Sequence, residues 1–336
     1  MRRILAIALA ALMILSVVYV GVFTVSAETT SELPANAKPI NDGDDFMSMQ
    51  AGGYYYLAAD ITIDFSYSKN FTGTLDGQGH TITTATPVFT SLNGATIRNL
   101  IIDGDIDDTE YENVYVGALA NSAGNGLIEN VHNKANVLGY KKANVGGLVG
   151  FNRGGTDLTI INCSNSGDVT GVRVAGIVAH SDGENILIKG CTNSGNLNRT
   201  SGNNGAGGIL ATISNNNAVL HIDDCVNSGD IVAGRPGGIV GDTSVKELVI
   251  TDCVNTGDIT SPSNYAGGIG SRPESRTRAV YRNCINTGTV TAFQSHCGGI
   301  VAYSSDSTAS YDGFKTSTFL YYKDNIIINK KKKAII

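Results

Sequence analysis

A segment of about thirty residues repeats along this chain, and this repetition limits the possible folds more than any other sequence feature. The clearest copy is Leu158–Val178, LTIINCSNSGDVTGVRVAGIV, and related copies recur from Leu100 to Val301. One column of small apolar residues advances by 31, 32, 28, 34, 28 and 31 positions. A fixed period of this length indicates one elongated repeat domain rather than two globular ones. The members of the column are Leu100, Val131, Cys163, Cys191, Cys225, Cys253 and Cys284.

Each copy contains three short apolar segments separated by turn residues, and none is long enough for a helix. The third segment reads GGLVG at Gly146 and GGIVG at Gly237. The pattern predicts three strands per coil of an all-β, right-handed parallel β-helix with about seven or more coils. Successive coils would stack about 4.8 Å apart.

Stacking gives the polar columns a structural role. A buried Asn ladder would satisfy polar groups at one turn, with each amide bonding its neighbour and the backbone. A Gly two positions later, such as Gly167, would supply a left-handed backbone conformation. The ladder residues are Asn133, Asn165, Asn193, Asn227, Asn255 and Asn286.

The five stacked cysteines replace Leu100 and Val131 in their column, so we expect a column of buried free thiols that fill the core. Disulfides and a metal site are the alternatives. Parallel Cβ vectors on in-register strands make the disulfide torsion difficult.

The chain divides into four parts. Residues 1–27 resemble a secretory signal peptide, and an uncleaved membrane anchor is the alternative. Residues 28–98 hold a lead-in, a short capping helix within Asn41–Gln50 and the first coils. Residues 99–302 are the repeats, and residues 303–336 form an irregular C-terminal cap with a basic tail, or else a truncated end.

The charge balance argues against a nucleic-acid partner, and we expect none. The chain has 24 basic and 30 acidic residues. Without Arg2 and Arg3 the balance is 22 against 30, or −8, and without Lys330–Lys333 it is 18 against 30, or −12. Nucleic-acid binding requires clustered basic residues. We expect a secreted or cell-surface protein, with membrane contact only if the N-terminal segment is not cleaved.

The repeats resemble a known motif. VGGLVGFNRGG at Val145–Gly155, followed by LTIINCSNSGDVTG, is similar to the GLUG motif of bacterial exported proteins. The upstream FTGTLDGQGHTI resembles the segment that precedes such repeats, and the likeness spans about residues 40 to 302. The resemblance implies a parallel β-helix of adhesin-like surface proteins or of non-catalytic parts of secreted proteases. GLVG in full stands only at Gly147–Gly150, and later copies read GIVA or GILA.

Two groups of acidic residues are candidate cation sites. The first contains Asp103, Asp105, Asp107 and Asp108, which could supply some oxygen ligands for calcium; a solvated acidic turn is the alternative. The second is an outward column of Asp168, Asp230 and Asp258 with Asn136 and Asn196, which could hold cations or a basic partner or simply be solvated.

Two further sequences bear on catalysis. DGQGH at Asp76–His80 is similar to stretches of pectin-degrading β-helix enzymes, but by itself it is a turn sequence. Cys297 and His296 are adjacent on a predicted strand and so point to opposite faces, which opposes mutual activation. The sequence contains no HExxH, so no zinc protease activity is carried over.

We therefore predict a non-enzymatic secreted or cell-surface β-solenoid, an adhesin-like binding or spacer module, with no catalytic residue and no cofactor unless calcium binds. Its partner would be a host or cell-wall glycan or a protein. The alternative is a polysaccharide-active enzyme, a lyase or glycoside hydrolase, on a pectin-lyase-like β-helix.

Overall fold

The computed structural model describes residues 33–110, 114–139, 142–273, 277–294 and 296–303, and the backbone of three later strands at 310–312, 315–323 and 326–329. The proposed signal peptide, residues 1–27, lies outside the described residues. The chain separates into two compact units, Met1–Ala37 and Lys38–Ile336. The fold and the candidate site belong to the second unit.

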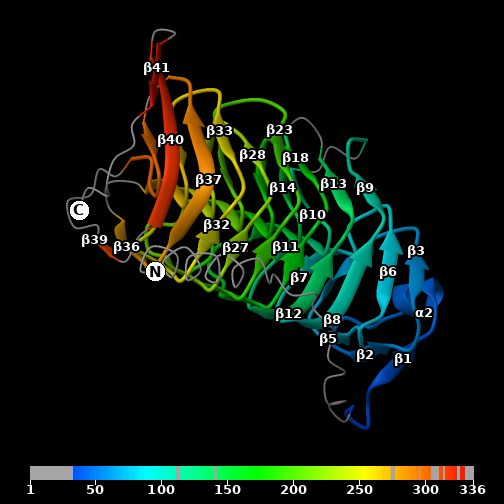
Figure 1. Cartoon of the computed structure of the whole chain (residues 1–336). Coiled ribbons are helices and arrows are strands. Elements are labelled where there is room, and N and C mark those ends of the chain that lie inside the picture. Colours follow the sequence, from blue (N-terminus) through cyan, green and yellow to red (C-terminus); the bar gives the residue numbers. More distant parts are fainter. Residues whose placement is uncertain are drawn as a thin grey trace, which may run out of the picture. The chain divides into compact units, whose positions relative to one another are not determined.

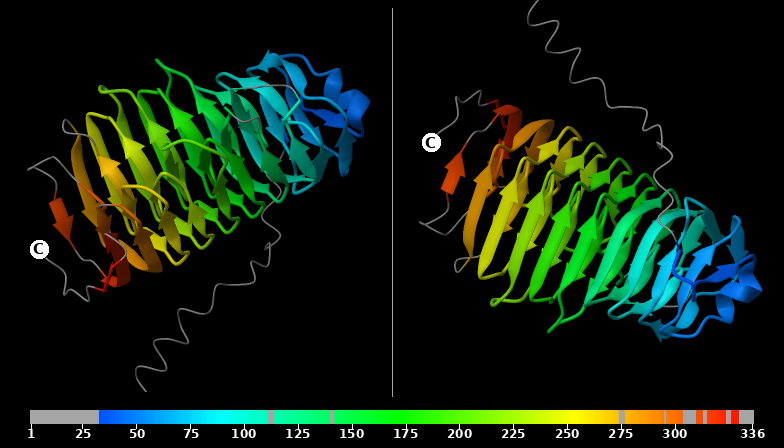
Figure 2. Two further views of the ribbon diagram at one scale, coloured as in Figure 1. Left: turned by 90° about the horizontal axis from the view of Figure 1, so that it is seen from above. Right: turned by 90° about the horizontal axis from the view of Figure 1, so that it is seen from below.

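The second unit is a parallel β-solenoid of about seven turns, in which strands of successive coils lie side by side (Figures 1 and 2). Its described strands form three sheets of 26, 7 and 8 strands. This confirms the predicted fold class.

The seven-stranded sheet and the eight-stranded sheet each receive one strand per coil. The seven-stranded sheet contains β10 (Tyr115–Gly117), β14 (Asn144–Gly146), β19 (Arg173–Ala175), β24 (Gly205–Gly207), β29 (Arg235–Gly237), β34 (Ala266–Gly267) and β38 (Cys297–Gly298). The eight-stranded sheet contains β4 (Tyr67–Phe71), β7 (Phe89–Leu92), β11 (Ala120–Ala123), β15 (Val149–Asn152), β20 (Val178–Ser181), β25 (Leu210–Ile213), β30 (Val240–Thr243) and β35 (Gly270–Pro273).

The 26-stranded sheet receives up to three strands per coil. Its members are β1 (Lys38–Ile40), β2 (Tyr54–Leu57), β3 (Ile61–Ile63), β5 (Thr74–Asp76), β6 (Thr81–Thr84), β8 (Thr96–Asp103), β9 (Asp105–Asp107), β12 (Gly126–Asn133), β13 (Asn136–Leu138), β16 (Leu158–Ile161), β17 (Ser164–Asn165), β18 (Val169–Gly171), β21 (Asn185–Lys189), β22 (Thr192–Asn193), β23 (Leu197–Arg199), β26 (Val219–Asp223), β27 (Val226–Asn227), β28 (Ile231–Val232), β31 (Glu247–Thr251), β32 (Val254–Asn255), β33 (Ile259–Ser261), β36 (Arg278–Arg282), β37 (Ile285–Ala292), β39 (Ser310–Asp312), β40 (Lys315–Lys323) and β41 (Ile326–Asn329).

The expectation of three strands per coil was too low. The coil that contains Leu158–Ser181 has five strands, β16 to β20. Asn162, at φ 54°, interrupts the first apolar segment between β16 and β17. The third segment divides near Gly176, between β19 and β20. The chain therefore turns within two segments whose composition alone suggested continuous strands.

The six ladder asparagines are almost fully buried and lie one above another. Asn165 Nδ2 donates to Asn193 Oδ1 at 2.8 Å and to the carbonyl of Gly167 at 2.8 Å. The same pair of bonds repeats from Asn133 to Asn255, each donating to the next asparagine. Buried amides that bond both a neighbouring coil and their own turn fix the register of the stack.

The predicted left-handed role of the glycine column is wrong beyond Gly104. Gly104 has φ 118°, but the later members do not have positive φ. A Cβ on Gly167 would lie 1.9 Å from the carbonyl oxygen of Ala135 in the preceding coil, so close approach requires glycine here. The left-handed positions instead precede the cysteine column, at Asn99, Asn130, Asn162, Gly190, Asp224, Asp252 and Asn283.

A short helix packs at the N-terminal end of the solenoid. α2 spans Gly43–Met47, within the range expected from the sequence, and Asp42 caps it by accepting from the backbone N–H of Asp45 at 2.9 Å. Phe46 is fully buried, with its ring 6.1 Å from Tyr67 and 5.6 Å from Phe89. The helix thus covers apolar rings of the first coils.

Strands continue after the last repeat. β39 pairs in parallel with β36, and β40 pairs in parallel with β37, whereas β41 returns antiparallel to β40. Lys330–Lys333 of the basic tail lie outside the described residues. Among the described residues, no helix is long and apolar enough to cross a membrane.

Candidate functional site

Two columns of side chains that change from coil to coil lie where the seven- and eight-stranded sheets meet. We call these two columns the corner row. The eight-stranded sheet contributes Ser122, Phe151, His180, Thr212, Asp242 and Arg272, which pair in register from coil to coil. The seven-stranded sheet side contributes Tyr115, Asn144, Arg173, Gly205, Arg235, Tyr265 and His296.

The first half of the corner row is aromatic. The rings of Tyr115 and Phe151 stack with centroids 4.4 Å apart, and Phe151 stacks on His180 at 5.6 Å. His180 Nδ1 lies 2.7 Å from Thr212 Oγ1, and its Nε2 lies 3.2 Å from Asp182 Oδ1. Burial lowers the pKa of His180 in spite of the nearby Asp182 carboxylate. At neutral pH the His180 imidazole in this stack is therefore mainly uncharged.

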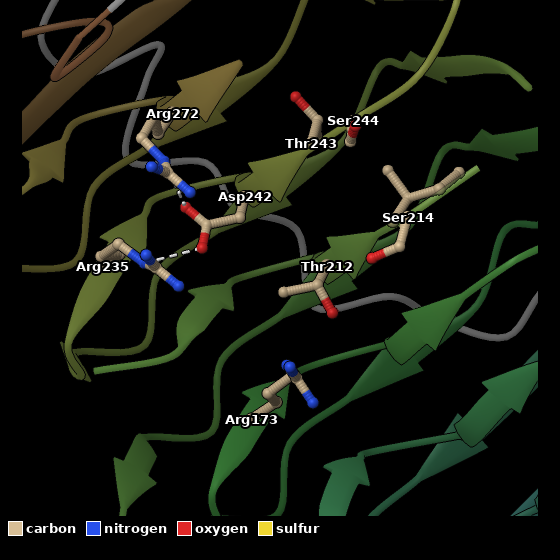
Figure 3. Close-up of a pocket in the computed structure, with 9 residues that line it drawn as sticks. Arg173, Thr212, Ser214, Arg235, Asp242, Thr243, Ser244 and Arg272 are labelled. Carbon is tan, nitrogen blue, oxygen red and sulfur yellow. Dashed lines mark ion pairs between the residues drawn. The ribbon is translucent and has the colours of Figure 1, made fainter. Parts of the chain in front are cut away.

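The second half of the corner row is basic. Arg235 Nε lies 2.7 Å from Asp242 Oδ2, and Arg272 Nε lies 3.6 Å from Asp242 Oδ1, so one buried carboxylate holds two guanidinium groups (Figure 3). Arg272 also lies over the Tyr265 ring, with its Cζ 5.7 Å from the centroid. Arg173 donates to Asn144 Oδ1 at 3.0 Å. All three arginines are fixed at the surface of a protein with net charge −6.

A hollow of about 140 Å³ opens among these arginines. Arg173, Thr212, Ser214, Arg235, Asp242, Ser244 and Arg272 surround it in Figure 3. Gly205 occupies the coil between Arg173 and Arg235, and Thr212 packs directly against it, because a Cβ on Gly205 would lie 2.8 Å from Thr212 Cγ2. The two arginines therefore stand two coils apart in this column, about 10 Å along the stack, and Thr212 lines the hollow between them.

A second hollow of about 460 Å³ lies at the N-terminal end of the corner row. Phe65 and Val114 line it with 68% and 55% of their surface exposed, next to Tyr115. Exposed large apolar side chains beside a hollow are typical of contact surfaces. Asp108 and Ser122 also line this hollow.

The structure does not gather the four predicted calcium ligands into one group. Asp103, Asp105 and Asp107 are exposed, whereas Asp108 is buried and lines the second hollow. Thr109 donates to Asp107 from both its hydroxyl and its backbone N–H, which lowers the pKa of Asp107. In the described part of the chain, no three His, Cys, Asp or Glu residues are arranged to hold a metal ion. Calcium binding stays a prediction.

The outward Asp and Asn column forms a second ladder. Asp168 Oδ1 accepts from the backbone N–H of Asn196 at 2.8 Å, and Asp230 Oδ1 accepts from that of Asp258 at 2.8 Å. Asn136, Asn196 and Asp258 accept from the following coil in the same way. These exposed side chains therefore join successive coils, a role that the sequence did not suggest.

The five column cysteines are buried free thiols. Each thiol donates to the carbonyl two residues earlier, as Cys163 Sγ does to Ile161 at 3.2 Å. Burial raises the pKa of Cys284 to about 12, and the pKa of Cys191, Cys225 and Cys253 is also raised. Thiols whose pKa is raised in this way stay protonated at neutral pH, so Cys191, Cys225, Cys253 and Cys284 are unreactive in the folded chain.

The two sequences considered above for catalysis make structural contacts instead. Asp76 is fully buried and its Oδ2 lies 2.7 Å from Arg98 Nε, while its Oδ1 accepts from Asn99 Nδ2 at 3.1 Å. His296 stacks on Tyr265 at 4.9 Å, whereas the Cys297 thiol donates to the carbonyl of Val290 at 3.2 Å. Cys297 and His296 are thus directed to different partners.

The corner row was not predicted, although the repeat alignment contained its signal. Its eight-stranded members follow directly after each third segment, as Phe151 follows GGLVG and Asp242 follows GGIVG. Its seven-stranded members stand two residues before that segment, as Arg173 and Arg235 do. Comparing these flanking positions across copies would have shown that they change from coil to coil.

Comparisons with known proteins identify the fold only. No family model matches the chain. No curated protein matches it either. A solved structure named IgA1 Protease is similar, with a TM-score of 0.52 and 18% sequence identity, over 87% of this chain and 22% of that chain. This chain thus corresponds to less than a quarter of that protein's length, and at such identity the likeness supports a shared β-solenoid architecture.

Proposed function

We propose that the chain is a non-enzymatic, secreted or cell-surface β-solenoid that acts as an adhesin-like binding or spacer module, and that the corner row is its binding surface. The signal-peptide-like residues 1–27 and the GLUG-like repeats support the location. The partner would be a glycan or protein of a host or of a cell wall.

One observation carries this proposal: the interior columns repeat while the corner row varies. The ladder position is Asn in six successive copies, from Asn133 to Asn286. Over the same coils the eight-stranded side of the corner row changes from Phe151 to His180, Thr212, Asp242 and Arg272. A uniform interior with a varied, rigidly spaced surface suits a scaffold that presents binding side chains.

The test is a combined binding and turnover measurement on the full secreted chain. Labelled protein is applied to arrays of glycans and to cell-wall fragments, and the same ligands are assayed for new reducing ends and unsaturated sugars. We expect saturable retention without turnover. Appearance of cleaved products would establish the polysaccharide-active enzyme instead.

A second experiment tests whether the ligand binds at the corner row. Phe151→Ala removes an aromatic member of the row, and Val232→Ala is the matched control, because Val232 is 41% exposed on the large sheet. Retention that weakens equally in both variants would place binding elsewhere on the solenoid.

A further inference from the structure

The hollow between Arg173 and Arg235 has the chemistry of a receptor for a negatively charged group. Three guanidinium groups and one carboxylate, that of Asp242, line it. The formal charge of its lining is therefore +2, on a chain whose net charge is −6. Local positive charge against an acidic background concentrates anions at this place.

The arginines are held in position before any ligand arrives. Arg235 and Arg272 share Asp242, Arg272 also lies over Tyr265, and Arg173 is bonded to Asn144. Their side chains are largely covered, with exposed fractions of 24% for Arg235 and 27% for Arg272. Guanidinium groups fixed in this way lose little conformational entropy on binding a carboxylate or sulfate.

The surroundings favour a sugar chain over a peptide. Ser214 and Ser244 bring hydroxyl groups to the rim, which can bond the hydroxyls of a glycan. An extended peptide would need free backbone groups to add a strand. Here the strand backbones already bond the neighbouring coils, as β24 pairs with both β19 and β29.

We propose that the hollow binds one carboxylate or sulfate group of an acidic polysaccharide, seated between Arg173 and Arg235 beside Ser214, with the chain continuing along the corner row. This inference rests on the proposed binding function and adds the ligand class. The backbones of the two arginines lie two coils apart, about 10 Å, and both side chains line the hollow that receives the anionic group.

The experiment measures dissociation constants of the full chain by calorimetry. The probes are an oligogalacturonate, a chondroitin sulfate oligosaccharide, a neutral cello-oligosaccharide, poly-glutamate and inorganic sulfate. We expect an acidic oligosaccharide to bind, with the carboxylated and sulfated probes showing which anion is preferred, and affinity to fall as salt is raised. Sulfate alone should compete with it. Equal binding of the neutral oligosaccharide, tighter binding of poly-glutamate, or no binding of either acidic oligosaccharide would each overturn the proposal.

Variants locate the site. The double variant Arg173→Gln/Arg235→Gln should weaken acidic binding at least tenfold, since each guanidinium contributes a charge-assisted bond. Ser214→Tyr keeps every charge but fills the hollow from an exposed position, and it should also weaken binding at least tenfold. The matched control is Arg278→Gln/Arg282→Gln, because both arginines are exposed on β36 and do not line the hollow. It should change affinity less than twofold.

The outcomes separate the two proposals. Cleavage of the oligosaccharide, with binding still dependent on Arg173 and Arg235, would refute the proposed non-enzymatic function but not the proposed anion site. Binding of neutral glycans or proteins that is unchanged in both Arg173→Gln/Arg235→Gln and Ser214→Tyr would refute the proposed anion site but not the proposed binding function. If the double variant loses its circular dichroism signal, Ser214→Tyr decides the question.

Discussion

The interior Asn ladder gives the sharpest stability prediction, for the substitution Asn193→Ala. Asn193 Nδ2 donates to Asn227 Oδ1 and to the carbonyl of Gly195, and Asn193 Oδ1 accepts from Asn165 Nδ2. Alanine would thus remove one partner from each of three buried groups. A buried polar group left without its bond costs about 1–3 kcal/mol, so the loss should be at least about 3 kcal/mol.

The expected loss of stability depends on position within the Asn ladder. Asn286 is its last member: it accepts from Asn255 and donates to the carbonyl of Gly288. Asn286→Ala therefore deprives two groups, and we expect a loss of about 2 kcal/mol. Asn198 is exposed on β23, and Asn198→Ala should change stability by less than about 0.5 kcal/mol.

Hydrogen exchange is the appropriate assay, because a solenoid can open locally rather than as one unit. The backbone N–H groups of Ser194 and Ser228 bond the carbonyls of Asn165 and Asn193 across coils. In Asn193→Ala, a loss of about 3 kcal/mol corresponds to roughly 100-fold faster exchange of these amides. If they exchange no faster than in Asn198→Ala, the ladder does not hold the coils together and the reasoning fails.

Three further predictions follow from the described residues. Gly195→Ala should prevent folding of the central coils, because its Cβ would lie 1.9 Å from the carbonyl oxygen of Gly167. Gly79→Ala is the control: its Cβ would have no atom within 4 Å, so it should cost only about 1 kcal/mol of backbone strain. Thermal unfolding of the two variants tests the difference. Thiol titration of the native protein should label Cys297 first and the five column cysteines only on unfolding, and rapid labelling of Cys191 would contradict the buried thiol column. Burial lowers the pKa of His132 from 6.5, so below pH 6.5 the unfolded chain binds a proton more readily than the folded chain does. The free energy of unfolding should therefore decrease as the pH falls from 6.5 to the lowered pKa of the folded state. His132→Gln should reduce this pH dependence, as measured by urea unfolding at several pH values.

The sequence was sufficient for the features that repeat. The Asn column predicted the ladder because a side chain that recurs at every coil has a copy of itself above and below it. It did not predict the left-handed turn at Asn162, because Asn, Gly and Asp share this position and the common property is backbone conformation. For Gly167 the residue type was clear but its cause was not, since close approach between coils depends on the neighbouring backbone.

The corner row was harder to predict for a related reason. Its members are defined by facing one another across two sheets, and the turn between β19 and β20 that brings Arg173 toward His180 was not visible in the apolar pattern. Likewise, Asp242 occurs once in its column and nothing in the sequence pairs it with Arg235, seven positions earlier. Sequence periodicity identifies residues that stack along the solenoid, whereas contacts across a bend require the coil geometry.

The two kinds of column have consequences for how binding can change. A substitution in the Asn ladder affects three buried groups in adjacent coils, so the interior tolerates little variation. A substitution in the corner row alters one side chain at a fixed place, as Thr212 and Asp242 show by occupying paired positions of β25 and β30 without a change of register. The rigid interior therefore allows the corner row to carry a different side chain at each coil, and ligand preference can be altered one coil at a time. Gly205 is the exception, because a Cβ there would lie 2.8 Å from Thr212 Cγ2 and 3.0 Å from the backbone nitrogen of Asp242, so a side chain at this coil would displace the neighbouring strands.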